Sequence, residues 1–174
     1  LSAPLSIWND HSDIMAARDI GWLQVFVENG QEACDHTIMA FKIAESGSVL
    51  LPMIVNLDGF ILTHVVEAVE LPDQELVDRF LSPYVPRLVL NPKHPVTMGA
   101  FAMPEIYTEF KMKHQVTLTK AYDRVLEVWQ EWGDLVGRHY RPVELYKTEG
   151  AKILLLTMGS LGEVAALAVY DQQA

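Results

Sequence analysis

Cysteine is nearly absent from this sequence of 174 residues, which contains only Cys34. A single cysteine cannot form an internal disulfide, nor can it supply the several thiolates of a structural zinc or cluster site. We therefore expect a reducing compartment and predict a cytoplasmic protein. His11 and Asp13 are only two ligands on a short loop, and no other histidine-rich spacing completes a set. The sequence predicts no metal site in this chain.

Positive charge is also scarce. Thirteen Lys and Arg stand against 23 Asp and Glu, which gives a formal net charge of −10. This balance would repel a phosphate backbone, so we expect no nucleic-acid partner. No apolar run reaches the roughly 18 to 20 residues of a membrane span, and no basic-then-apolar leader opens the chain. We expect no membrane association.

What the sequence does contain is enough apolar material for a core, with 50% hydrophobic residues. Residues 22–27 and 49–57 are apolar runs rich in β-branched and aromatic side chains, typical of strands covered on both faces. Between them, Gln31–Glu45 repeats apolar residues at a spacing near 3.6, which predicts a helix of about four turns. This order predicts an α/β fold with a parallel sheet and flanking helices.

Further elements follow from the same patterns. The sequence predicts short strands at 5–8 and 151–158, a helical turn at 14–18, and helices at 74–81, 104–137 and 161–170. Residues 63–71 are compatible with strand or helix, whereas the prolines of residues 82–103 favour an extended or turning chain. Gly159-Ser160 predicts a tight turn, because it lacks the spaced glycines and lysine of a phosphate-binding loop.

The ends of the chain bear on its organisation. It opens at Leu1 without an initiator Met and closes on a predicted strand–helix unit with no following strand. We therefore expect a piece of a longer polypeptide. The predicted organisation is a first unit at 1–140, a linker at 141–150, and the opening unit of a second α/β domain at 151–174.

Polar residues follow the predicted strands, at the edge where parallel sheets bind ligands. Glu28, Asn29 and Gln31 stand where a strand ends and a helix begins, so they can hydrogen-bond a ligand or cap free helix amides. Asp58 precedes Gly59, which permits a turn or a close backbone approach. The Asp58 carboxylate either contacts a ligand or only fixes that turn.

Two upstream features also have alternative interpretations. The loop Asn9–Asp13 is either a gating loop that closes over a ligand or a solvated loop whose Asp13 caps the next helix. Arg18 can grip a carboxylate through two parallel hydrogen bonds, or it can pair with Asp13 or Asp19.

Taken in order, these motifs resemble the alpha subunit, or alpha-like region, of the 2-oxoacid:ferredoxin oxidoreductases, most closely the pyruvate-type enzyme, pyruvate synthase. The resemblance extends over nearly the whole chain. The matching runs are Leu1-Ser2-Ala3-Pro4, Asn9-Asp10-His11-Ser12-Asp13, Arg18-Asp19, Gly21-Trp22, Glu28-Asn29 with Gln31-Glu32-Ala33, Leu57-Asp58-Gly59-Phe60 with His64, Pro72-Asp73-Gln74-Glu75, Asn91-Pro92, Pro95-Val96-Thr97-Met98-Gly99, Tyr107-Thr108-Glu109-Phe110 and Thr157-Met158-Gly159-Ser160.

The resemblance implies a thiamine diphosphate-dependent enzyme that oxidatively decarboxylates pyruvate to acetyl-CoA and passes electrons to ferredoxin. It implies that residues 1–140 are the later half of a pyrimidine-binding-type domain and that 151–174 begin a transketolase C-terminal-like domain. A partner subunit would share the cofactor, and partner subunits would hold Mg and 4Fe-4S clusters. The expected partners are these subunits, ferredoxin, the 2-oxoacid and CoA.

The resemblance also assigns candidate roles. The catalytic candidates are Asp10 and His11; the cofactor-binding candidates are Glu28, Asn29, Gln31 and Asp58; the substrate-binding candidates are Asn9, Asp13 and Arg18. In the family, the glutamate that activates the aminopyrimidine and the arginine that grips the substrate fall before Leu1, so we expect the isolated chain to be inactive. The alternatives are an oxalate or branched-chain 2-oxoacid enzyme of the same family, or a non-catalytic scaffold domain.

Overall fold

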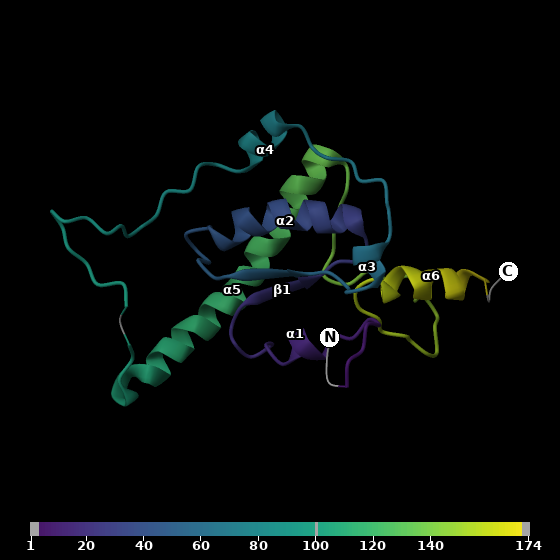
Figure 1. Ribbon diagram of the computed structural model, residues 1–174, viewed down its shortest axis with the longest axis horizontal. Coiled ribbons are helices and arrows are strands. Elements are labelled where there is room, and N and C mark those ends of the chain that lie inside the picture. Colours follow the sequence, from purple (N-terminus) through teal and green to yellow (C-terminus); the bar gives the residue numbers. More distant parts are fainter. Residues whose placement is uncertain (1–3, 100, 172–174) are drawn as a thin grey trace.

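The computed structural model describes residues 4–99 and 101–171, so the matching run at Leu1–Ala3 lies outside the described residues. Strands β1 (Leu23–Phe26) and β2 (Met53–Asn56) pair in parallel, with Leu23 opposite Met53 and Phe26 opposite Asn56. Helix α2 (Gly30–Ala44) connects them and packs on β2 and on the long helix α5 (Pro104–Val136) (Figure 1). The predicted α/β fold with a parallel sheet and flanking helices is confirmed.

The remaining helices are short, apart from α6. They are α1 (Ser12–Met15), α3 (Ile61–His64), α4 (Gln74–Phe80) and α6 (Leu161–Asp171). The predicted long helix is confirmed: it begins at Pro104, whose missing N–H costs nothing there, and it ends before Gly137, which has φ +78°. Across residues 4–99 and 101–171, no helix combines the length and the hydropathy of a membrane span.

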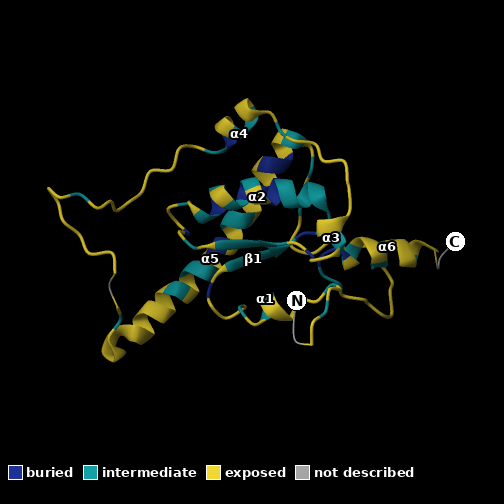
Figure 2. Cartoon of the chain, viewed as in Figure 1, coloured by how far each residue is buried: buried dark blue, intermediate teal, exposed yellow. Residues whose placement is uncertain are grey.

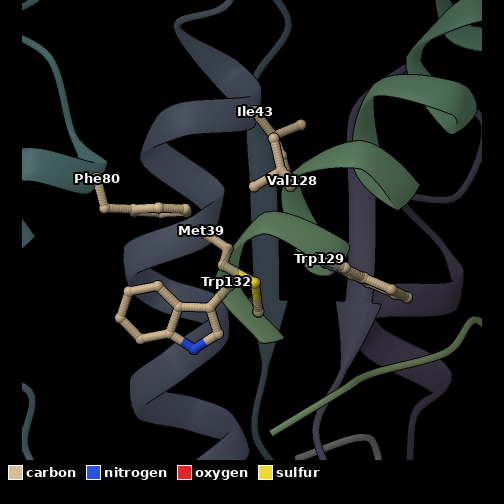
Figure 3. Close-up of a cluster of buried hydrophobic side chains, with 6 residues drawn as sticks. All are labelled: Met39, Ile43, Phe80, Val128, Trp129 and Trp132. Atoms are coloured by element: carbon tan, nitrogen blue, oxygen red, sulfur yellow. The ribbon is translucent and has the colours of Figure 1, made fainter. Parts of the chain in front are cut away.

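The core lies where α2, α4 and α5 meet (Figure 3). Its buried side chains are Met39, Ile43, Phe80, Val128, Trp129 and Trp132. The rings of Phe80 and Trp132 meet edge to face, with centroids 4.8 Å apart, and Trp132 is fully buried. Aromatic side chains bury the largest areas in a core. Trp129 and Trp132 therefore anchor this core through their packing.

The two faces of the sheet differ. Leu23, Val25 and Met53 pack against the core, while the alternate residue Gln24 donates to the Ala17 backbone oxygen at 3.4 Å on the other face. All residues of β1 and β2 are only half-buried. The expectation of strands covered on both faces is therefore wrong in degree, because every residue of both strands keeps part of its surface exposed.

Three predicted strand regions differ from the structure. Residues 5–8 and 151–158 are irregular, and in the described part of the chain neither has a strand beside it to complete a ladder. Val49 and Leu50 instead continue the turn after α2 by donating to the Ser46 backbone oxygen, so the second strand begins only after Pro52. Residues 63–71, left open between strand and helix, contribute the end of α3 and then run extended without pairing.

Candidate functional site

Asp58 joins three separate parts of the chain at the carboxyl edge of the sheet. It follows β2 closely, and its side chain is 1% exposed. Its Oδ2 accepts hydrogen bonds from Asn9 Nδ2 at 2.8 Å and from the Ser160 backbone amide at 2.6 Å. His11 Nε2 lies 3.5 Å from Oδ1. The carboxylate thus ties the loop Asn9–Asp13 and the turn before α6 to the end of β2.

The turn at Gly159 brings Ser160 to this carboxylate. Gly159 has φ +65°, and a Cβ placed on it would lie 2.6 Å from both Asp58 oxygens. Only glycine adopts this conformation without strain and leaves room for the carboxylate. Ser160 is 5% exposed, and Asn9 Nδ2 lies 3.5 Å from its Oγ. The predicted tight turn is present, and it also serves as a docking point for Asp58.

The loop Asn9–Asp13 is shaped by hydrogen bonds to its own backbone. Asp10 Oδ1 accepts from the Ser12 amide at 2.8 Å, and Asp13 Oδ1 accepts from the Ile14 amide at 2.7 Å. His11 precedes α1 and meets Phe26 of β1 edge to face, with ring centroids 5.1 Å apart. The loop therefore lies against β1 as well as against Asp58.

A second polar group lies where β1 ends. Asn29 Oδ1 accepts from the Glu32 amide at 2.9 Å and so caps α2, while Asn29 Nδ2 donates to Glu163 Oε1 of α6 at 2.8 Å. Glu32 Oε2 accepts from the Glu28 amide at 2.8 Å. Asn29 therefore caps α2, one of the two roles expected at this position, and it also joins α2 to α6.

Carboxylates crowd this end of β1. Burial raises the pKa of Glu32 to about 7, and the charges of Glu28, Glu163 and Glu144 add to that rise. Burial, Glu163 and Glu144 also raise the pKa of Glu28. A carboxyl group with a pKa near 7 can both give and take a proton near neutral pH. Within the described residues, no group of three or more His, Cys, Asp or Glu is arranged to hold a metal ion.

Gln31 lies in a different network from Asp58. Its Nε2 donates to Asp35 Oδ1 and to the Glu70 backbone oxygen, both at 3.1 Å, and its Oε1 accepts from the Glu70 amide at 2.7 Å. The amide therefore fastens α2 to the extended segment that follows α3. Its proposed role at a cofactor has no support from the contacts that Gln31 makes here.

The centre of that network is Asp35, which is fully buried. Arg138 Nε and Nη2 donate to its two oxygens at 2.7 Å and 3.0 Å, and the Tyr140 hydroxyl donates at 2.5 Å. Burial alone would raise the pKa of Asp35, but the hydrogen bonds from Arg138 and Tyr140 outweigh burial and lower the pKa. This contact anchors the chain after α5 onto α2.

Arg18 lies outside these contacts. Its side chain is 68% exposed, and its Nε is 3.5 Å from Asp19 Oδ2. This is the surface ion pair that was the alternative to carboxylate gripping. Exposed pairs of this kind hold a side chain only weakly.

A comparison with known families identifies the chain's relatives. Residues 1–130 match the family described as pyruvate flavodoxin/ferredoxin oxidoreductase, thiamine diphosphate-binding. The chain belongs to this family. Pyruvate synthase subunit PorA of Pyrococcus horikoshii is 48% identical over 162 residues, and PorA of Methanothermobacter thermautotrophicus is 44% identical over 161. Ketoisovalerate oxidoreductase subunit VorA of Pyrococcus horikoshii is 37% identical over 163 residues.

The match covers most of this chain but less than half of each relative. In each comparison 92% of this chain is covered, but only 41% of the Pyrococcus proteins and 42% of the Methanothermobacter protein. The chain thus spans about two fifths of the length of these oxidoreductase subunits.

The family's cofactor fits the sheet edge only in part. The residues that make the contacts described there, Glu28 through its backbone amide, are Asn9, His11, Glu28, Asn29, Glu32, Asp58, Ser160 and Glu163, none of which is Lys or Arg. Carboxylates repel a diphosphate anion. Amide, imidazole and carboxyl groups do match the donors and acceptors of a neutral aminopyrimidine. The edge therefore fits the pyrimidine end of thiamine diphosphate and not the diphosphate end.

Ser160, Glu32 and Glu163 were not predicted from the sequence as members of the site. Ser160 was interpreted as part of a turn only, although the Gly-Ser pair stands at a predicted strand–helix boundary, where ligand edges form. Glu32 stands three residues after Asn29, the spacing of a capping box. Glu163 gave no local signal, because its contact with Asn29 spans 134 positions.

Proposed function

We propose that this chain forms one wall of a thiamine diphosphate site in the alpha subunit of a 2-oxoacid:ferredoxin oxidoreductase, which oxidatively decarboxylates pyruvate to acetyl-CoA. The observation that carries the proposal is the junction of Asn9, Asp58 and Ser160. This junction brings three family motifs, far apart in the sequence, to one sheet edge. The names of the PorA relatives support pyruvate as the substrate.

Each candidate residue has a distinct role in this proposal. Thiamine diphosphate, when bound, supplies the group that stabilises the carbanion formed on decarboxylation. Asp58 positions Asn9 and His11, so that His11 and Asp10 face the reacting substrate, while the Asn9 amide donates to the substrate carboxylate and Asp13 shapes the loop that closes over the substrate. Arg18, paired with Asp19 at the surface, would reach the substrate only by leaving that pair. Glu28 and Asn29 contact the aminopyrimidine, with Glu32 beside them. Gln31, committed to Glu70 and Asp35, acts by holding α2 in place.

The rest of the machinery lies on other chains. The acidic sheet edge is suited to the pyrimidine alone, so a partner subunit holds the diphosphate with its Mg, and 4Fe-4S clusters on partner subunits carry electrons to cytoplasmic ferredoxin. CoA is the second substrate. Residues 1–140 are then part of the pyrimidine-binding-type domain, residues 141–150 its linker, and residues 151–174 the start of a transketolase C-terminal-like domain.

A branched-chain 2-oxoacid is the second candidate substrate, because VorA shares 37% identity over the same length. An apolar pocket distinguishes two substrates that differ by one small apolar group by only about 1–3 kcal/mol in transition-state binding. A few pocket residues therefore decide between pyruvate and a branched-chain 2-oxoacid.

The test is an assay of the purified native complex. Ferredoxin reduction is followed with CoA and, in turn, pyruvate, 2-oxoisovalerate and oxalate. The proposal predicts the highest kcat/KM with pyruvate. A higher kcat/KM with 2-oxoisovalerate or oxalate would show that the proposed substrate is wrong. If a complex loaded with thiamine diphosphate reduces no ferredoxin with any of these acids, the proposed reaction is wrong and the non-catalytic scaffold is favoured.

A further inference from the structure

Residues 65–71, the extended chain that follows α3, are all exposed (Figure 2), and we call them the flanking segment. They lie beside the first turn of α2. Glu67 Oε2 accepts a hydrogen bond from the Gly30 backbone amide at 2.7 Å. Further along, the Gln31 side chain donates to the Glu70 backbone oxygen at 3.1 Å and accepts from the Glu70 amide at 2.7 Å. The flanking segment is therefore fixed to the start of α2 at two positions.

The start of α2 already holds an anion of the protein's own. A helix leaves its first four backbone amides without partners inside the helix, and the partial positive charge there attracts anions. In α2 these are the amides of residues 29–32. Asn29 Oδ1 accepts from the Glu32 amide, and the Glu67 carboxylate accepts from the Gly30 amide. A carboxylate from a separate part of the chain therefore stands where a free helix start would attract an anion.

The glycine at position 30 makes room for this carboxylate. A Cβ on Gly30 would lie 2.9 Å from Glu67 Oε2 and 3.3 Å from Val69 Cγ2, so the Glu67 carboxylate would have to move. Gly30 follows β1 and begins α2, which is the place where α/β folds bring a helix start close to a phosphate group. In this chain the space that the glycine leaves is taken by Glu67.

We propose that Glu67 is a specificity-determining residue that keeps phosphate groups away from the start of α2. Its carboxylate uses the Gly30 amide and repels a second anion. The contacts of Glu70 with Gln31, and its ion pair of 3.0 Å with Arg138, hold the flanking segment so that Glu67 stays in place. The inference rests on the proposed function in naming the ligand, because thiamine diphosphate then meets this edge with its pyrimidine and not with its diphosphate.

The first test uses the native complex saturated with thiamine diphosphate, so that the cofactor's own diphosphate site is filled. Inorganic phosphate is the probe, and its binding is measured by isothermal titration calorimetry at constant ionic strength. Glu67→Ala should bind phosphate at least about tenfold more tightly than the parent complex, because the helix start loses its internal anion. Glu75→Ala, which removes an exposed glutamate from the first turn of α4, is the matched control and should bind phosphate like the parent.

The second test locates the bound phosphate by hydrogen–deuterium exchange of the peptide that contains Gly30, followed by mass spectrometry. The Gly30 amide should exchange faster in Glu67→Ala than in the parent, and phosphate should slow it again in the variant. Glu67→Gln keeps an acceptor for this amide without the charge, so its phosphate affinity should lie between those of the parent and Glu67→Ala.

Two results overturn the proposal. One is a phosphate affinity of Glu67→Ala equal to that of the parent complex, and the other is tighter binding that leaves exchange at Gly30 unchanged. Neither measurement uses oxoacid oxidation. A parent complex without pyruvate-dependent ferredoxin reduction would therefore refute the proposed function and leave the role of Glu67 to be decided by phosphate binding.

Discussion

Asn9 and Asp58, 49 positions apart in the chain, meet through a hydrogen bond of 2.8 Å at the carboxyl edge of the sheet. The same carboxylate accepts the amide of Ser160, which is 102 positions away. A buried carboxylate is stable when several donors satisfy its oxygens. The two bonds therefore fix the loop, the strand end and the last turn relative to one another.

Alanine at Gly159 should break this junction. The positive φ and the close approach of Asp58 both oppose a Cβ, so Gly159→Ala should lower the free energy of unfolding of the complete subunit by about 1–3 kcal/mol. Gly99→Ala, where an added Cβ meets nothing within 4 Å, is the control. Denaturant unfolding of both variants is the measurement. Equal losses in the free energy of unfolding for the two variants would show that the close approach of Gly159 to Asp58 does not contribute to stability.

Alanine at Asp10 should affect catalysis more than stability. Asp10 shapes the loop beside the proposed substrate position, so Asp10→Ala should reduce kcat by about tenfold or more while the melting temperature falls by only a few degrees. The exposed Asp123→Ala is the matched control. Turnover and thermal unfolding are measured on the same preparations, and proportional losses in the two would assign Asp10 to stability alone.

Arg138 should be important for folding. Arg138→Ala leaves the fully buried Asp35 carboxylate without its charged partner, which should cost about 3–5 kcal/mol in the free energy of unfolding. Arg18→Ala removes an exposed ion pair and should cost about 1 kcal/mol or less. Unfolding by denaturant distinguishes them, and a small loss for Arg138→Ala would mean that Tyr140 and Gln31 suffice to satisfy Asp35.

Glu32 should make the free energy of unfolding depend on pH. Its pKa is about 7 in the folded chain, above the ordinary value of 4.5. Between these values the unfolded chain binds fewer protons than the folded one, so the contribution of Glu32 to the free energy of unfolding falls as pH rises from 4.5 to 7. Buried His36, whose pKa is lowered to about 4, contributes in the opposite sense between about 4 and its ordinary 6.5.

A difference measurement isolates Glu32 from His36. The free energy of unfolding of Glu32→Gln should rise relative to the parent chain as pH increases from 4.5 to 7, because the variant has no carboxyl group to deprotonate. Glu75→Gln, at an exposed position in α4, should run parallel to the parent. Parallel profiles for both variants would remove Glu32 as a titrating group in this range.

Elements with a strong local pattern were predictable from the sequence. The 3.6-residue spacing of apolar residues predicted α2. The same spacing predicted α5, and Pro104 and Gly137 located its two ends to within a residue. Strands at 5–8 and 151–158 were predicted from composition alone. A strand requires a partner for its hydrogen bonds, and the described chain offers none beside these segments.

The sequence predicted where part of the candidate site lies, but it did not predict which residues hydrogen-bond to one another there. The rule that parallel sheets gather polar side chains at their carboxyl edge placed Asn29 and Asp58 after neighbouring strands, whereas Asn9 and His11 reach that edge from a segment that forms no strand. It gave no information about Glu163 or Ser160, whose partners lie more than a hundred positions away. It also grouped Gln31 with the rim, although the helix turns that side chain toward Asp35, on a different face.

The central claim is that the junction at Asp58 belongs to the active site of a pyruvate-oxidising complex. The direct measurement is the rate of pyruvate- and CoA-dependent ferredoxin reduction by the native complex carrying Asp58→Asn, beside Asp73→Asn, whose aspartate makes no side-chain cap bond. We predict that Asp58→Asn lowers kcat/KM by about a hundredfold in an assembled complex, since misplaced reacting groups lose that much rate. Full activity of assembled Asp58→Asn, equal to that of Asp73→Asn, would contradict the account.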